Sequence, residues 1–209
     1  MKMLGNPAAG KKKLQHLCFV KRLVIFASGK GSNAMSLVRH YRENKKAEVL
    51  HIFTNNPLAG VIEPAVLENI PVVILNRKEY FNDPGLVRFL HEQKTDLIVL
   101  AGFLWLVPPL LIRSFPEKII NLHPALLPAY GGKGMFGMHV HRAVIAAGEK
   151  ESGVSFHYVN EQYDKGKIIH QAKIPLSQGE TAESLSEKIS LLEKEHFPVA
   201  IDKALGEGS

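Results

Sequence analysis

Two residue types that can handle a reacting carbonyl stand close together at the end of an apolar run, in "KIINLHPALLPAY". Residues i and i+2 of a strand point to the same face, so Asn121 and His123 share one face. Pro124 then ends the strand, because proline lacks the backbone donor that a sheet needs. An amide that donates and an imidazole that titrates near neutral pH suit reactions that pass through an oxyanion.

A third candidate is the acid Asp164 in "QYDKG". A carboxylate beside the imidazole would hold the ring and raise its pKa. The alternative is that Asn121 and His123 cap local backbone groups and that Asp164 only forms a turn. Spacing alone favours this alternative, and both interpretations stay open at this point.

A glycine turn, "SGKGSN" (28–33), follows the first apolar run and opens a helical pattern. Glycines let the backbone approach a ligand closely, and the start of a helix offers free N–H groups to a phosphate. A dinucleotide is disfavoured because residues 54–56 supply no acid for a ribose, and the order of glycines and Lys30 does not fit a nucleotide P-loop. The turn indicates either a monophosphate site or a plain tight turn with Ser32 as N-cap.

Short apolar runs alternate with helical patterns over the first two thirds of the chain. The predicted strands are 22–27, 48–54, 71–75, 96–102 and 118–122, and the clearest helix is 84–93. This alternation predicts an α/β fold, a doubly wound, mostly parallel sheet with helices on both faces. Ligands of such sheets bind at the carboxyl ends of the strands, where the glycine turn and Asn121 lie.

The pattern changes after residue 150. Strands are predicted over 152–159 and 167–176, and the seven residues that join them are too few for a parallel crossover. We therefore expect a C-terminal antiparallel hairpin. A long closing helix is predicted from about Thr181 to Leu205, with Thr181 as its N-cap.

Charge and composition limit the class of protein. The net charge of +6 comes from residues 1–22, which carry six basic and no acidic side chains, so the rest holds 20 of each and offers no basic footprint for nucleic acid. The apolar stretch 97–112 is interrupted by glycine and proline and is too short to span a membrane. Cys18 is the only cysteine, which fits a cytoplasmic setting. We expect a flexible tail over 1–21 and one domain over 22–209.

Other polar and aromatic residues give weaker signals. The histidines of "HVH" (139–141) would not share a helix face, so a metal site there is disfavoured. Trp105 is more typical of a core or pocket wall than of a binding platform. His157 is as typical of a core as of a functional histidine, and Glu195 would usually be a solvated charge on the closing helix.

Several motifs together resemble one family. "SGKGSN", "AGFLWLV", "INLHPALLPAY", "SGVSFHYV", "YDKG" and "EHFP" occur in the order and at the spacings of the glycinamide ribonucleotide (GAR) formyltransferases. The resemblance covers residues 22–205 and implies a Rossmann-like formyltransferase fold. It implies transfer of a formyl group from 10-formyltetrahydrofolate to the amine of GAR in purine synthesis.

The resemblance also assigns roles to the three candidate catalytic residues. Asn121 and protonated His123 would stabilise the tetrahedral oxyanion. Asp164 would support the imidazolium and organise proton transfer. No metal is expected.

Binding residues are implied in the same way. The ribonucleotide would be held by Gly31, Ser32, Asn33 and Glu195. The folate would be held by Asn121 and by a pocket wall formed by Leu104, Trp105, Leu106 and Val107. Trp105 stands where the family is expected to carry a basic residue.

Two related activities share the catalytic segment. Methionyl-tRNA formyltransferase needs a further domain and basic surface, and 10-formyltetrahydrofolate hydrolase needs no phosphate turn. A hydrolase, or a formyltransferase acting on another amine, is the alternative. A non-catalytic folate or nucleotide sensor would not need all three catalytic side chains. Small-molecule partners and a monomer or homodimer are expected, and the longer loop at 131–138 has a composition compatible with a mobile flap.

Overall fold

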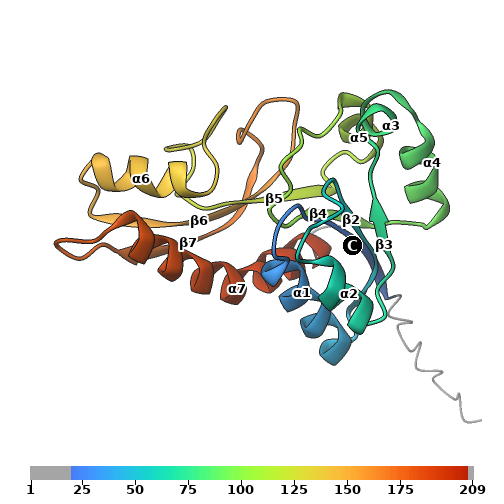
Figure 1. Ribbon diagram of the computed structural model, residues 1–209, viewed down its shortest axis with the longest axis horizontal. Helices are drawn as coiled ribbons and strands as arrows, with labels where there is room; N and C mark the ends of the chain where they lie inside the picture. Colours follow the sequence, from blue (N-terminus) through green and yellow to red (C-terminus); the bar gives the residue numbers. More distant parts are fainter. Residues whose placement is uncertain (1–19, 207–209) are drawn as a thin grey trace, which may run out of the picture.

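In the computed structural model, which describes residues 20–206, seven strands form one sheet in the order β3-β2-β1-β4-β5-β6-β7 (Figure 1). The strands are β1 Lys21–Phe26, β2 Ala47–Thr54, β3 Val72–Ile74, β4 Leu97–Leu100, β5 Ile119–His123, β6 Glu151–Tyr158 and β7 Ile168–Pro175. The helices are α1 Ser32–Asn44, α2 Ile62–Leu67, α3 Arg77–Asn82, α4 Gly85–Glu92, α5 Pro109–Ser114, α6 Met138–Ala146 and α7 Ala182–Gly206. Cys18 and nearly all of the predicted tail lie outside the described residues.

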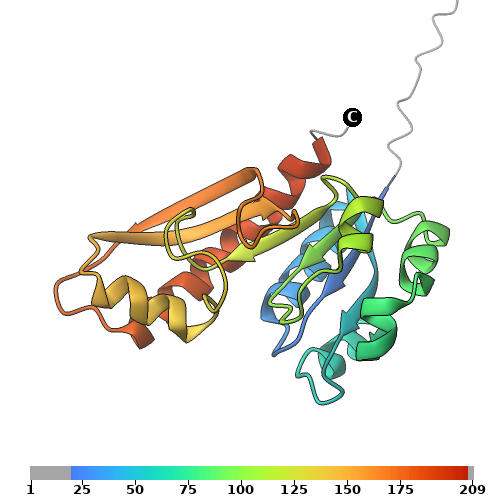
Figure 2. The same ribbon diagram turned by 90° about the horizontal axis from the view of Figure 1, so that it is seen from above.

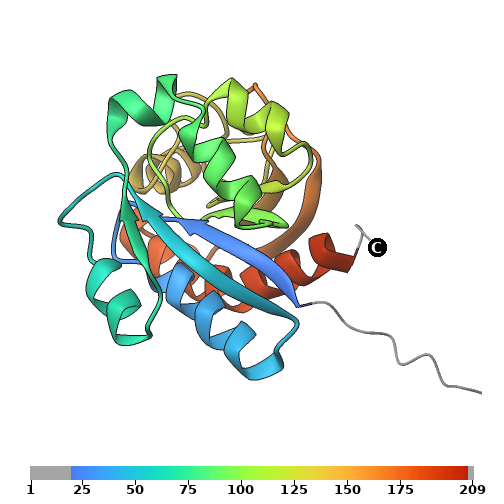
Figure 3. The same ribbon diagram turned by 90° about the vertical axis from the view of Figure 1, so that its right-hand side faces the viewer.

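The central strand β1 shows why helices cover both faces. Its alternate residues Leu23 and Ile25 belong to the core under α1 and α7, while Val24 and Phe26 belong to the core under α3, α4 and α5. All four side chains are fully buried. Successive side chains of a strand point to opposite faces, so a continuous apolar run needs two covered faces. Figure 3 shows the sheet between these two helical layers.

The sheet changes direction after β5. The first five strands in the sheet order, β3-β2-β1-β4-β5, pair in parallel. In contrast, β6 is antiparallel to β5, and β7 is antiparallel to β6. The β6–β7 hairpin extends from the parallel part of the sheet, and α7 runs along it (Figure 2). The Oγ1 of Thr181 accepts a hydrogen bond from the amide of Ser184 (3.1 Å), which is the predicted N-cap of α7.

The predicted fold class is confirmed: a doubly wound, mostly parallel sheet with an antiparallel hairpin and a long closing helix. Predicted and observed strand ends agree within one or two residues. The predicted strand 96–102 stops at Leu100, and Gly102 takes a left-handed φ of 73° that no strand can continue. Within residues 20–206, no helix has the length and apolar character needed to cross a membrane.

The glycine turn between β1 and α1 is fixed by a close approach. Gly31 has a φ of 75°, and a Cβ built on it would lie 2.2 Å from Cγ2 of Val61. Gly31 is itself the N-cap of α1, and Ser32 is the first helical residue without a side-chain cap hydrogen bond. The alternative of a turn capped by Ser32 is therefore wrong, and the first N–H groups of α1 lack a side-chain acceptor from the N-cap.

Replacing Gly31 by alanine tests this constraint. Gly31→Ala should lower the free energy of unfolding by about 1–3 kcal/mol, because the left-handed backbone is strained for alanine and Val61 must shift. Urea denaturation measures the loss. Gly29→Ala is the matched control, because a Cβ there meets nothing within 4 Å. Equal stability of the two variants would contradict the close-approach constraint.

Candidate active site

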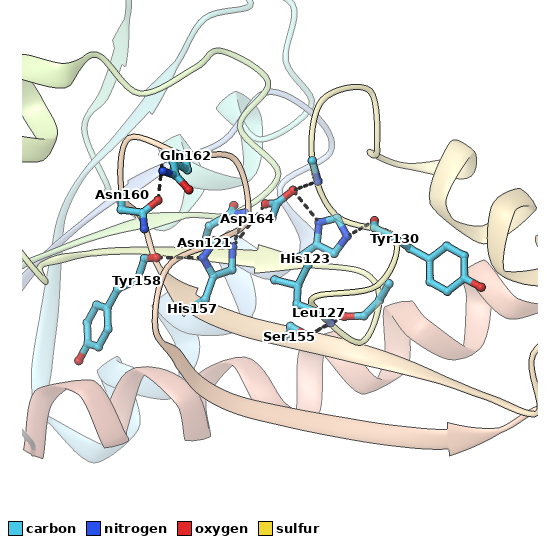
Figure 4. A network of polar contacts seen from close by, with 12 residues as sticks. Asn121, His123, Leu127, Tyr130, Ser155, His157, Tyr158, Asn160, Gln162 and Asp164 are labelled. Atoms are coloured by element: carbon cyan, nitrogen blue, oxygen red, sulfur yellow. Dashed lines mark hydrogen bonds and ion pairs between the residues drawn. The ribbon is translucent and has the colours of Figure 1, made fainter.

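Asn121 and His123 lie at the carboxyl end of β5, and Asp164 reaches them from the link between β6 and β7 (Figure 4). The antiparallel register places Asn121 opposite His157 and His123 opposite Ser155. Opposite residues of an antiparallel pair have neighbouring side chains on one face. The strand pairing thus gathers two histidines, an amide and a carboxylate at one place.

His123 is buried and held by both ring nitrogens. Its Nε2 lies 2.8 Å from the carbonyl oxygen of Tyr130. Since a carbonyl only accepts, Nε2 carries a proton. Its Nδ1 lies 3.6 Å from Oδ2 of Asp164. A proton on Nδ1 would therefore give an imidazolium beside a carboxylate.

Burial dominates the titration of His123. Removal of the ring from water lowers its pKa below the ordinary value, even though the charge of Asp164 and the carbonyl of Tyr130 act to raise it. The sequence predicted a raised pKa from the carboxylate alone. Asp164 acts in the predicted direction, but the desolvation of a nearly inaccessible ring is larger.

Asp164 is a part-buried carboxylate with several partners. Its Oδ2 accepts a hydrogen bond from the amide of Gly132 (2.8 Å), and its Oδ1 lies 3.5 Å from Nε2 of His157. Burial on its own raises the pKa of Asp164, but the contact with His157, the Gly132 amide and the nearby histidines together hold it below the ordinary value. The carboxylate is therefore ionised at neutral pH.

The turn that follows β5 is anchored by two side chains from the hairpin. The Oγ of Ser155 donates to the carbonyl of Ala125 (2.6 Å) and accepts from the amide of Leu127 (2.9 Å). The Nε2 of Gln171 donates to the carbonyl of Leu127 (3.0 Å). These bonds fix the path of the chain toward Tyr130, whose carbonyl orients His123.

His157 is a member of the site that the sequence left undecided. Its Nε2 lies 3.2 Å from Nδ2 of Asn121, and its Nδ1 lies 2.9 Å from the carbonyl oxygen of Tyr158. The signal that could have found it is the antiparallel register. Once β6 pairs with β5, the residue opposite Asn121 must face the site.

The glycine turn meets an acid of α7, but not the predicted one. The Nδ2 of Asn33 donates to Oε2 of Glu193 (2.8 Å). Glu195 is exposed, and two residues along a helix rotate a side chain by about 200°. The structure therefore places Glu193, not Glu195, at the turn. Burial raises the pKa of Glu193 although the bond from Asn33 acts to lower it.

The side chains of the predicted folate wall, residues 104–107, differ in exposure. Leu104 and Leu106 are exposed, and Val107 is buried. Trp105 packs against Tyr80, Phe81 and Phe103. The guanidinium of Arg77 lies 5.3 Å from the centroid of the Trp105 ring. A cation from α3 thus stands beside the residue that replaces the expected basic one.

The histidines of 139–141 do not converge. Both lie on α6, where His139 is exposed and His141 is buried near His123, which lowers the pKa of His141 further than burial alone. Over residues 20–206, no group of three or more His, Cys, Asp or Glu residues could hold a metal ion.

Comparison with known proteins identifies the family. The family model described as "Formyl transferase" matches residues 21–201. The chain belongs to the formyl transferase family. Asn121, His123 and Asp164 all lie in the matched region.

Individual relatives are similar over most of this chain. A chloroplastic phosphoribosylglycinamide formyltransferase of Arabidopsis thaliana is 37% identical over 84% of the chain, but the chain spans only 62% of that relative's length. The phosphoribosylglycinamide formyltransferase of Bacillus subtilis is 35% identical, over 90% of the chain and 96% of the relative. The crystal structure of the Bacillus halodurans phosphoribosylglycinamide formyltransferase superposes with a TM-score of 0.81 at 35% identity, covering 90% and 97% of the two chains.

The coupling of Asp164 to His123 can be measured directly. Asp164→Asn should lower the pKa of His123 further, because the carboxylate is the largest influence that raises it. The pKa is read from the His123 ring signals in an NMR titration. Glu161→Gln, which removes an exposed carboxylate from the same link, should leave the pKa of His123 unchanged. A His123 pKa that stays constant in Asp164→Asn would contradict the coupling.

Proposed function

We propose that this protein transfers the formyl group of 10-formyltetrahydrofolate to the amine of GAR, giving formylglycinamide ribonucleotide and tetrahydrofolate. One observation carries the proposal: the Asn121, His123 and Asp164 cluster lies on the same sheet edge as the N-terminus of α1, where free N–H groups could bind a phosphate. Membership of the formyl transferase family supports formyl transfer, and the helix start supports a phosphorylated acceptor.

The spacing of the two sites suits GAR. Strands β1 and β5 are separated only by β4, so their carboxyl ends lie about 10 Å apart. GAR carries its phosphate at one end and its primary amine at the other. With the phosphate on the N-terminus of α1, the amine can extend toward Asn121 and His123.

The first chemical step is attack of the GAR amine on the formyl carbon. A C–N bond forms, and the carbonyl electrons move to the oxygen, which becomes an oxyanion. Nδ2 of Asn121 stabilises this charge, and Nδ1 of His123 accepts the proton that the amine loses and then donates it toward the oxyanion. His123 uses Nδ1 because its Nε2 proton is already donated to Tyr130.

The second step breaks the bond between the formyl carbon and N10 of the folate. The carbonyl re-forms, N10 receives a proton, and the former amine loses one. Asp164 stays ionised and keeps a proton on His123 favourable while the oxyanion is present. Proton transfer between the two nitrogens then runs through water or His123, so no net proton is consumed.

Asn33 and Glu193 extend the acceptor site beyond the phosphate. The Oδ1 of Asn33 is buried without a hydrogen-bond partner, while its Nδ2 is held by Glu193. A buried acceptor without a partner costs free energy that a ligand donor can recover. A ribose hydroxyl or the glycinamide N–H of GAR is such a donor.

The folate lies against the segment between β4 and α5 in this proposal. Leu104 and Leu106 are exposed apolar side chains that a pterin ring would cover. Arg77 supplies the cation that Trp105 does not, and the carboxylates of the folate tail are its natural counterpart. The link that carries Asp164 offers backbone groups to the pterin.

The substrates are small molecules, and the absence of a basic excess outside residues 1–22 gives no support for a nucleic-acid partner. We infer a monomer or homodimer in the cytoplasm. The plant relative is named for the chloroplast, so the compartment can differ within the family.

Turnover of GAR tests the proposed function. The protein should release tetrahydrofolate from 10-formyltetrahydrofolate only when GAR is present. Asn121→Ala, His123→Ala and Asp164→Ala should each lower kcat by roughly 10²–10³ while the chain stays folded, because each removes stabilisation of the oxyanion or its partner. Release without GAR would favour a hydrolase, and near-normal turnover in all three variants would refute their roles.

The choice between two acids of α7 gives a separate test. Glu193→Gln should raise KM for GAR roughly 10–100-fold, because a charge-assisted bond that orients Asn33 is lost. Glu195→Gln is the matched control on the same helix and should leave KM unchanged. Steady-state kinetics with varied GAR measures both. A larger effect from Glu195→Gln would restore the original assignment.

A further inference from the structure

His157 contacts two of the proposed catalytic side chains, Asn121 and Asp164. Its ring faces Asn121 from the opposite strand and Asp164 from the hairpin link (Figure 4). Two titratable groups lie near it, Asp164 and, from β5, His123. The ring is buried, so its polar partners come from the protein.

The hydrogen-bond partner of Nδ1 determines whether this ring nitrogen of His157 carries a proton. Nδ1 lies 2.9 Å from the carbonyl oxygen of Tyr158, which can only accept. Nδ1 of His157 therefore carries a proton. The charge of the ring then depends on whether Nε2 carries a second one.

Nε2 of His157 has two neighbours, and they differ in whether they can donate a hydrogen bond to it. Oδ1 of Asp164, at 3.5 Å, can only accept because this carboxylate is ionised. The amide of Asn121, at 3.2 Å, can present either its nitrogen or its oxygen, since rotation by 180° exchanges the two. An unprotonated Nε2 would aim a lone pair at the carboxylate and would take a proton of Nδ2 from Asn121.

A protonated Nε2 reverses both contacts. It donates toward Asp164 and draws Oδ1 of Asn121 toward the ring. The amide nitrogen of Asn121 then points to the other side, where both of its protons are available to an oxyanion. A positive ring also compensates the part-buried carboxylate.

We propose, on the basis of the function proposed above, that His157 is a positioning residue whose Nε2 proton holds Oδ1 of Asn121 and so aims Nδ2 of Asn121 at the reacting formyl oxygen. Asn121 remains the residue that touches the substrate. His157 acts only through it and through Asp164.

The first test is spectroscopic and needs no substrate. Protein labelled with ¹⁵N in its histidines and asparagines should show protons on both ring nitrogens of His157 at neutral pH. Its Nε2–H should be donated toward Oδ1 of Asn121. An unprotonated Nε2 at neutral pH would overturn the proposal, whether or not the protein acts on GAR.

The second test uses a matched pair of substitutions. His157→Asn places an amide at the level of Nδ1, so the bond to Tyr158 is kept and the Nε2 donor is lost. His157→Gln reaches the level of Nε2 and can still donate to Asn121. We expect kcat to fall roughly 10²–10³-fold in His157→Asn, as for loss of an oxyanion donor, and less than about tenfold in His157→Gln. KM for both substrates should change little in either variant.

The outcomes separate a positioning role from a packing role. Equal losses of kcat in the two variants, or a rise in KM without a loss of kcat, would overturn the proposal. Urea unfolding of both variants shows whether His157→Asn has lost its fold, and in that event the ¹⁵N measurement on the unaltered protein decides. If the unaltered protein does not formylate GAR, the proposed function fails, while the proton on His157 is still determined.

Discussion

The candidate site is organised around a carboxylate that is largely withdrawn from water. An ionised group in such a position is stable only when donors and positive charge surround it. Asp164 takes the amide of Gly132 and faces the rings of His123 and His157. These partners come from the loop after β5, from β5 and from β6, so the carboxylate links segments that are far apart in the sequence.

The change of strand direction makes this arrangement possible. In a purely parallel sheet the carboxyl end of β5 would face only loops, because each neighbouring strand ends at the same edge. Here β6 runs back past β5 and presents His157 and Ser155 beside Asn121 and His123. The hairpin link then returns to the same edge and delivers Asp164. The parallel half supplies the helix start that we propose binds a phosphate, and the antiparallel half adds His157 and Asp164 to Asn121 and His123.

The architecture was predictable from patterns that depend on neighbouring residues. Apolar runs located the strands, a seven-residue link predicted the hairpin, and Asn121 and His123 followed from the period of a strand. What could not be predicted depends on register and on helix rotation. His157 is recognisable only once it is paired with Asn121, and the choice of Glu193 over Glu195 depends on which side of α7 meets the turn. The arginine beside Trp105 comes from a different helix, so no local pattern reveals it.

The lowered pKa of His123 has a consequence for the proposed reaction. In the free protein the ring is kept neutral by desolvation, and Asp164 opposes this only in part. In the proposed mechanism, an oxyanion that forms beside Nδ1 adds a second negative charge, which favours the protonated ring. The positive charge of His123 is therefore strengthened as the substrate charge develops and is weak before it. Stabilisation that grows toward the transition state accelerates the reaction, whereas a permanently charged ring would also bind the ground state. Burial of His123 and its pairing with Asp164 thus shift the pKa of the ring in opposite directions, and in the proposed mechanism the charge of the oxyanion moves the balance toward the protonated ring.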